Sequence, residues 1–234
     1  QLSNQRDVRH WTNTLKRFIG PPKGKRVLDV GTGPGFFSVL LARSGYQVTA
    51  ADGSEGMVRQ AERNFQNQHV KVELFCSDVV RLEEFPPNSF DAIVSRDVVW
   101  TLYDPETAYR RWMEILKPGG RLIVFDGNYR MDRNSLHIRL WKKLAGLLTW
   151  IKEGKREKTK VNEEGESVFR DLPLVTVERP EKDRELLTGL GYQILGIGWD
   201  RYRNSLRRWS FWTGGYQGKT FQIVAKMPRI KNFK

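Results

Sequence analysis

Residues 27–35 have the sequence VLDVGTGPG, an apolar run that ends in three glycines within five residues. This pattern predicts a buried parallel strand that turns sharply into a helix, and residues 36–43 continue with apolar residues at helical spacing. Glycines at the turn let the backbone approach a ligand closely. The spacing differs from the G-x-G-x-x-G pattern of nicotinamide-binding folds, because Gly35 comes one residue early and Phe36 occupies the third glycine's place.

The chain around this turn alternates short apolar runs with helical patterns. Strands are expected at residues 26–30, 47–51, 70–75, 90–95 and 121–125, with Ser54 and Asp104 as N-caps of two intervening helices. Residues 136–151 and 180–190 also have helical patterns, and residues 192–199 and 220–227 predict a closing pair of strands. Such alternation predicts a parallel sheet whose ligands bind at the carboxyl ends of the strands.

Four motifs along residues 26–126 resemble class I methyltransferases, which use S-adenosylmethionine (SAM) and release S-adenosylhomocysteine. The motifs are residues 29–35 (DVGTGPG), residues 52–57 (DGSEGM), the pair Ser77-Asp78 and residues 116–120 (LKPGG). Residues 95–102 and 125–129 resemble the methyltransferase-11-like branch of this family, which includes quinone-biosynthesis and other small-molecule enzymes.

The resemblance implies an α/β fold with a Rossmann-like, doubly wound, seven-stranded sheet, mostly parallel with an antiparallel last strand, plus a helical cap insertion. We expect one domain over residues 1–234. Within it we expect an N-terminal helical segment (1–25), a cofactor-binding core (26–127), an inserted basic cap (130–172) and a C-terminal part that completes the sheet (173–234). The apolar stripe of residues 136–151 is expected to pack on the domain above the acceptor pocket, with a membrane-surface helix as the alternative.

The resemblance also assigns roles in cofactor binding. The carboxylate of Asp52 would accept two charge-assisted hydrogen bonds from the ribose diol, and Asp78 would receive the adenine amino group. Asp29 suits the ammonium end of the cofactor, and Met57 would lie near the adenosine. Simpler alternatives are a helix cap for Asp52 and a turn residue for Asp78. The expected cofactor-binding residues are Asp29, Gly31, Thr32, Gly33, Gly35, Asp52, Gly53, Met57, Ser77, Asp78, Val79, Ser95 and Arg96.

The acceptor site is expected after the fourth and fifth strands. Asp97 or Asp126 would act as a base or orienting group, and Trp100 and Tyr129 would form an aromatic wall; the alternative is that Trp100 is a core residue and Asp126 caps a turn. Asp97 replaces the asparagine that this branch often has, so no family role carries over to it.

Charge and cysteine content say less about the function, but they bear on binding partners and on the cellular compartment. Ten Lys/Arg oppose three acidic residues over 130–160, and nine oppose none over 201–234, whereas the rest of the chain is nearly neutral. The single cysteine, Cys76, is expected to be a buried or half-buried packing residue rather than a nucleophile, and one cysteine excludes an intrachain disulfide and fits a cytoplasmic protein. The three histidines lack metal-ligand spacing, and no metal is expected. No apolar run is long enough to span a membrane.

Three functions remain open from the sequence. The first is a methyltransferase for a small-molecule acceptor, anionic or neutral. The second is a methyltransferase for RNA or another polyanion, which the arginines and aromatic residues of 199–216 would bind; the alternative for that segment is a connection packed on the sheet edge. The third is a non-catalytic module that binds nucleic acid or a membrane surface. The acceptor, the methylated atom and the oligomeric state are not determined by the sequence.

Overall fold

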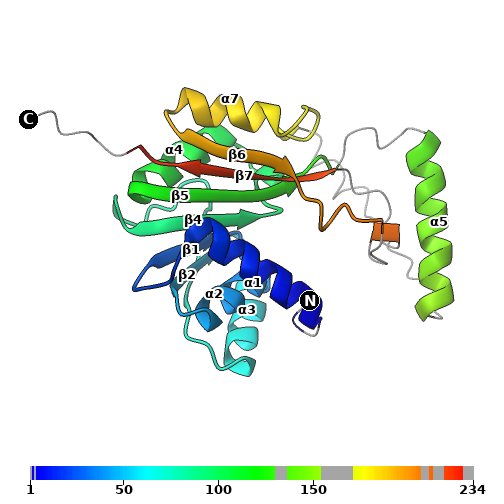
Figure 1. The fold of residues 1–234 in the computed structure, drawn as a ribbon, viewed down its shortest axis with the longest axis horizontal. Coiled ribbons are helices and arrows are strands. Elements are labelled where there is room, and N and C mark those ends of the chain that lie inside the picture. Colours follow the sequence, from blue (N-terminus) through cyan, green and yellow to red (C-terminus); the bar gives the residue numbers. More distant parts are fainter. Residues whose placement is uncertain are drawn as a thin grey trace, which may run out of the picture.

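The computed structural model describes residue 2 and residues 4–129, 136–153, 171–206, 211–212 and 219–228. Helices and strands alternate along the chain from the first strand to the fifth, except that no helix separates the third strand from the fourth (Figure 1). The elements are α1 (Gln5–Ile19), β1 (Arg26–Val30), α2 (Phe36–Arg43), β2 (Gln47–Asp52), α3 (Glu55–Asn67), β3 (Glu73–Cys76), β4 (Phe90–Arg96), η1 (Val99–Thr101), α4 (Pro105–Ile115), β5 (Leu116–Gly127), α5 (Leu136–Glu153), α7 (Glu181–Gly189), β6 (Gln193–Trp199) and β7 (Thr220–Lys226).

The seven strands form one sheet in the order β3-β2-β1-β4-β5-β7-β6. The strands β1 to β5 pair in parallel, whereas β7 lies antiparallel between β5 and β6. The expected fold class is therefore confirmed. The order reverses direction at β1, so the carboxyl ends of β1 and β4 lie at the switch point where ligands bind in such sheets.

Alternate residues of the strands face two separate hydrophobic layers. Val27 of β1 packs with Trp11 of α1 and Phe37 of α2 on one face of the sheet. Leu28, its neighbour along β1, packs with Trp112 of α4 on the other face, together with residues of α7. Both faces of the parallel part are thus covered by helices, which explains why its strands are apolar runs rather than alternating patterns.

The starting residues of two strands and the solvent exposure of Cys76 differ from the predictions. β3 begins at Glu73 rather than at Val70, because the Val70 amide still donates to the carbonyl of Phe65 and closes the end of α3. β5 begins at Leu116 and includes the glycine turn that was expected to precede it. Cys76 is exposed at the end of β3, so the expectation of a buried or half-buried cysteine was wrong.

The helix α5 stands beside the carboxyl edge of the sheet and apart from it (Figure 1). Its Trp141 ring stacks on Trp212 at 4.9 Å between centroids and meets Phe211 edge-on, and Ala145 on the same face is buried. The leucine stripe of this helix is exposed instead of packed on the domain, which corrects the expected packing, because the aromatic contact turns a different face inward. The rest of the expected cap, residues 130–135 and 154–170, lies outside the described residues.

Candidate cofactor-binding site

A cavity of about 710 Å³ opens at the carboxyl ends of β1, β2 and β4. This volume falls within the range of pockets that enclose drug-sized ligands. The cavity collects residues from four separate loops, which is the arrangement that the strand order predicts. Its lining consists of Asp29, Gly31, Thr32, Gly33, Pro34, Phe37, Asp52, Gly53, Ser54, Met57, Asp78, Val79, Val80, Arg96, Asp97, Val98, Thr101, Leu102 and Tyr103.

The turn after β1 brings backbone, rather than side chains, to the cavity wall. Gly31 and Gly33 have φ of 66° and 55°, values that L side chains rarely adopt. A Cβ on Gly33 would meet nothing within 4 Å and would project into open space, whereas a Cβ on Gly31 would lie 2.2 Å from Val98 Cγ2. The first glycine therefore allows close packing, and the second keeps a surface open beside the cavity.

Gly35, in contrast, does not line the cavity. It adopts φ of 86° immediately before α2, and a Cβ there would lie 2.4 Å from the ring of Phe65, a buried residue of α3. The third glycine of the motif thus permits contact between the turn and α3. Gly35 was expected to bind the cofactor, but the structure gives it a role in packing instead.

Asp52 lies at the end of β2, half-buried, with its carboxylate directed across the turn. Oδ2 accepts a hydrogen bond from the Gly33 amide at 2.8 Å, and Oδ1 accepts one from the Ser54 amide at 2.9 Å. The carboxylate therefore joins the two loops that follow β1 and β2. A carboxylate has about four acceptor positions, so two remain for a diol in the cavity.

Asp29 and Arg96 place opposite charges at another part of the cavity wall. Asp29 is buried and accepts hydrogen bonds from Thr32 Oγ1 at 2.8 Å and Ser38 Oγ at 2.7 Å. Burial raises the pKa of Asp29, while these two hydroxyls and the charge of Arg96 oppose the shift. Burial lowers the pKa of Arg96, whose guanidinium lies over the ring of Phe37 at 4.7 Å. Such a pair of charges suits a ligand end that carries both an ammonium and a carboxylate group.

Asp78 and Tyr103 form the wall beyond α3. Oδ1 of Asp78 accepts from the Val80 amide at 2.9 Å, and Oδ2 accepts from the Tyr103 hydroxyl at 2.7 Å. Hydrogen bonding to Asp78 raises the pKa of Tyr103. Asp78 therefore both orders its own turn and faces the cavity, and Tyr103 is a lining residue that the sequence did not single out.

Most of the expected cofactor residues come together, and a few do not. Ser95 is fully buried within β4, and Ser77 lines a smaller adjoining pocket. Ten expected residues line the main cavity: Asp29, Gly31, Thr32, Gly33, Asp52, Gly53, Met57, Asp78, Val79 and Arg96. Eight further lining residues were not predicted, because their residue types are common in any protein and form no motif. They are Pro34, Phe37, Ser54, Val80, Val98, Thr101, Leu102 and Tyr103.

Three residues from distant parts of the chain meet at one point of the cavity wall, where only Asp97 lines the cavity itself. Asp97, which lines the cavity and has φ of 62°, accepts a hydrogen bond from the Tyr129 hydroxyl. Arg203 donates to Asp97 Oδ1 at 2.8 Å and to the Tyr129 hydroxyl oxygen at 2.8 Å. Burial and the Asp97 charge raise the pKa of Tyr129 well above its usual value, so its hydroxyl remains a donor. Trp100 packs edge-to-face with Tyr129 at 5.4 Å, as the expected aromatic wall requires, although neither ring lines the main cavity.

Asp126 is fully buried and lies away from the cavity lining. Its Oδ2 accepts from Arg179 Nη1 at 2.9 Å and from the Trp100 amide at 3.0 Å. Arg179 also donates to both oxygens of Asp183 at 2.6 and 2.7 Å, and none of the three side chains is exposed. Asp126 therefore holds the loop after β4 in place, and this position does not support its expected role as a base at the acceptor.

Comparison with known proteins agrees with this geometry. Residues 28–124 match the family model described as a methyltransferase domain. This stretch of the chain is therefore similar to a methyltransferase domain. Among curated relatives, it is 34% identical over 114 residues to demethylmenaquinone methyltransferase of Clavibacter sepedonicus, a match that covers 49% of this chain and 46% of that protein. It is 37% identical over 103 residues to a ubiquinone biosynthesis O-methyltransferase of Xanthomonas axonopodis pv. citri, covering 44% of this chain and 43% of that protein.

Solved structures extend the similarity of the methyltransferase domain to most of the chain. A SAM-dependent methyltransferase from Aquifex aeolicus superposes with a TM-score of 0.60 at 19% identity, covering 92% of this chain and 89% of that one. The chain therefore shares the fold of that structure. The chain spans about half the length of the curated relatives it matches. The part that matches the family model, residues 28–124, includes the glycine turn, Asp52 and Asp97.

Proposed function

We propose that the protein is a SAM-dependent methyltransferase that transfers a methyl group to a small-molecule acceptor. The observation that carries this proposal is the hydrogen bond from the Gly33 amide to Asp52, which joins the turn of residues 31–33 to Asp52 in the wall of one cavity. The ribose diol would bind the remaining lone pairs of Asp52. The methionine end would lie between Asp29 and Arg96, whose charges are complementary to its ammonium and carboxylate groups.

The adenine would occupy the wall formed by Asp78, Val79 and Met57. Asp78 has an acceptor beside the cavity for the exocyclic amino group, and the two apolar side chains would contact the ring. Bound SAM would supply an electrophilic methyl group on a sulfonium. The residues of this chain would position it and exclude water, which accounts for most of the acceleration when the acceptor is a competent nucleophile.

The acceptor would lie against Asp97, with Tyr129 and Arg203 behind it. We propose a hydroxylated aromatic ring of the quinol class as acceptor, supported by the names of the relatives and by the place of the Asp97 carboxylate in the cavity lining. In an O-methylation the acceptor oxygen forms a bond to the methyl carbon as the sulfur–carbon bond breaks. Asp97 would receive the hydroxyl proton, while Arg203 and Tyr129 hold its carboxylate in place.

The cofactor proposal is tested by calorimetry with S-adenosylhomocysteine on the wild type and on Asp52→Asn. The amide keeps the size of the side chain but replaces one acceptor oxygen with a donor. We expect the affinity to fall by about 30- to 100-fold, the loss of one to two hydrogen bonds to a charged group. The matched control is Asp104→Asn, another carboxylate at a helix N-terminus that does not line the cavity. Equal affinity of the wild type and Asp52→Asn would refute the proposed ribose contact.

The acceptor proposal is tested with methyl-labelled SAM and a set of acceptors that includes a short-chain hydroquinone and total RNA. We expect label in the hydroquinone and a strong reduction in Asp97→Asn, which keeps hydrogen bonding but cannot take up the proton. Label in RNA alone would contradict the acceptor class while leaving the cofactor proposal intact. Much of the basic sequence that suggested RNA lies outside the described residues.

A further inference from the structure

The helix α5 presents an exposed apolar stripe that the methyltransferase site does not use. Leu136, Leu140, Leu144 and Leu147 follow one another at intervals of three and four residues and therefore share one face of the helix. Their exposed fractions are 71%, 58%, 41% and 51%, and Trp150, one turn beyond Leu147, is 51% exposed. Scattered exposed leucines need no explanation, but a continuous stripe does.

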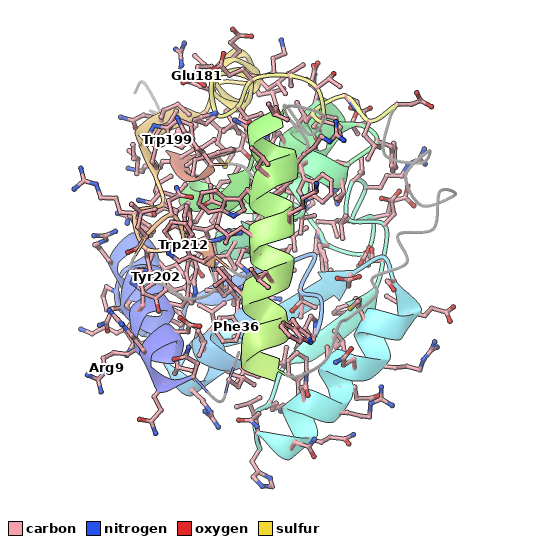
Figure 2. All side chains as sticks on the ribbon, turned by 90° about the vertical axis from the view of Figure 1, so that its right-hand side faces the viewer. Arg9, Phe36, Glu181, Trp199, Tyr202 and Trp212 are labelled. Atoms are coloured by element: carbon pink, nitrogen blue, oxygen red, sulfur yellow. The ribbon has the colours of Figure 1, made fainter. Side chains whose placement is uncertain are left out.

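This stripe points away from the protein because another face of the helix makes the contact with it. Trp141 and Ala145, four residues apart, lie on the inner face, where Trp141 stacks on Trp212. Figure 2 shows α5 at the front of the molecule with Trp212 behind it. The helix is thus attached through one face and leaves the leucines accessible to a partner.

Charge identifies the partner. Arg139 and Lys143, four residues apart, are exposed and lie at the border of the stripe, next to Trp150 on the helical wheel. The helix sequence contains four Lys/Arg and a single acid, Glu153, at its last position. An apolar stripe bordered by basic residues and a tryptophan is the pattern of a helix that lies in the interface of an anionic bilayer. A second copy of the helix would instead place positive charge against positive charge.

The dimensions fit a helix on the membrane surface rather than across it. Leu136 to Trp150 spans about 21 Å at 1.5 Å per residue, shorter than a hydrocarbon core. Among the described residues, no helix is long and apolar enough to cross a membrane. We propose that α5 docks the protein on anionic lipid bilayers, with its leucine stripe in the acyl boundary and Arg139 and Lys143 at the headgroups. In that position the carboxyl edge of the sheet lies on the same side of the molecule as the lipid (Figure 1).

The test is co-sedimentation of the full chain with vesicles, with no cofactor or acceptor present. The probes are vesicles of phosphatidylcholine alone and of phosphatidylcholine mixed with phosphatidylglycerol. We expect binding to the mixed vesicles, and weaker binding to the neutral ones and at high salt. Because the assay requires no methyl transfer, its failure is distinguishable from failure of the proposed function.

Two pairs of variants separate the apolar and electrostatic contributions. Leu140→Gln with Leu147→Gln preserves helix propensity and removes two of the four leucines of the stripe; we expect binding at least tenfold weaker. Its control is Leu195→Gln, an exposed leucine on β6. Arg139→Gln with Lys143→Gln is expected to weaken binding to mixed vesicles by about 25-fold, about fivefold for each charge. Its control is Lys16→Gln with Lys71→Gln, two exposed lysines elsewhere.

Three results would overturn the proposal. They are absence of wild-type binding to mixed vesicles at low salt, full binding by the leucine variant, or a wild-type dimer that the leucine variant converts to monomer in sedimentation. Fluorescence provides a check on insertion: the spectral blue shift on vesicle binding should decrease in Trp150→Phe while binding persists. Circular dichroism and thermal unfolding of each variant exclude loss of fold as the cause.

Discussion

Replacing Arg179 by methionine should be among the most destabilising single changes in the protein. Arg179 is fully buried and is the cation between two buried carboxylates, Asp126 and Asp183, with its guanidinium also 5.1 Å from the ring centre of Phe221. Methionine fills a similar volume but leaves both carboxylates without a counter-charge. Breaking a buried ion pair from one side costs about 3–5 kcal/mol of unfolding free energy, and we expect a loss of that size at pH 7.

The pH dependence of this loss is a sharper test than its size. Burial and the neighbouring carboxylates already raise the pKa of Asp126 to about 6, despite Arg179. Without the arginine, the pKa of Asp126 should rise further, so the folded variant binds more protons near neutral pH than the folded wild type does. Since proton uptake by the folded state stabilises it, the difference between wild type and variant should shrink as the pH falls from 7.5 to 5.

Urea denaturation at several pH values measures both effects. The control is Arg59→Met, which breaks the exposed Arg59–Glu55 pair and should cost under about 1 kcal/mol at any of these pH values. A loss below about 1 kcal/mol for Arg179→Met at pH 7, or a loss that grows on acidification, would refute this account of the buried cluster.

Three further predictions concern the glycine turn, Asp126 and Tyr129. Gly35→Ala should lower the unfolding free energy by about 2–3 kcal/mol, because the alanine adds both backbone strain and a clash with Phe65. The control is Gly45→Ala, where φ is 89° but the nearest neighbour of the added Cβ lies at 3.7 Å, so we expect a loss of only about 1 kcal/mol. Equal losses in urea denaturation would contradict the Phe65 contact. The pKa of Asp126 is raised to about 6, so the folded state takes up a proton there as the pH falls from 7 to 5 and gains stability. The unfolding free energy of the wild type should therefore rise by about 1–2 kcal/mol relative to that of Asp126→Asn over this interval. Parallel profiles of unfolding free energy against pH would contradict the raised pKa. Tyr129→Phe removes the hydroxyl that contacts Asp97 and Arg203, so methyl transfer should slow by about tenfold. The affinity for S-adenosylhomocysteine, measured by calorimetry, should stay unchanged. A large loss of this affinity would place Tyr129 at the cofactor instead.

The sequence was informative wherever a function depends on local spacing. The glycine turn, Asp52 and Asp78 each lie at or just after the carboxyl end of a strand, and parallel strands bring these ends to one edge, so the cavity could be predicted from residue order. Gly35 shows the limit of a motif. Its place in the turn between strand and helix was predicted, but its contact with Phe65, thirty residues later, was not.

Long-range partners could not be predicted from a single sequence. Arg179 meets Asp126 across 53 residues, and Arg203 meets Asp97 across 106. Each arginine is one of many in a basic chain, and nothing in its neighbourhood signals a distant carboxylate. The helix α5 is a different case. Its stripe was evident, but which face would turn inward depended on Trp141 and Trp212, which are distant in the chain.

We propose that one cavity binds the nucleoside of SAM between the turn of residues 31–33 and Asp52. A crystal structure of the protein with S-adenosylhomocysteine would test this proposal. We expect both ribose hydroxyls within hydrogen-bond distance of the Asp52 carboxylate and the amino-acid end of the ligand beside Asp29 and Arg96. Ligand density elsewhere on the protein, or a ribose that makes no contact with Asp52, would contradict it.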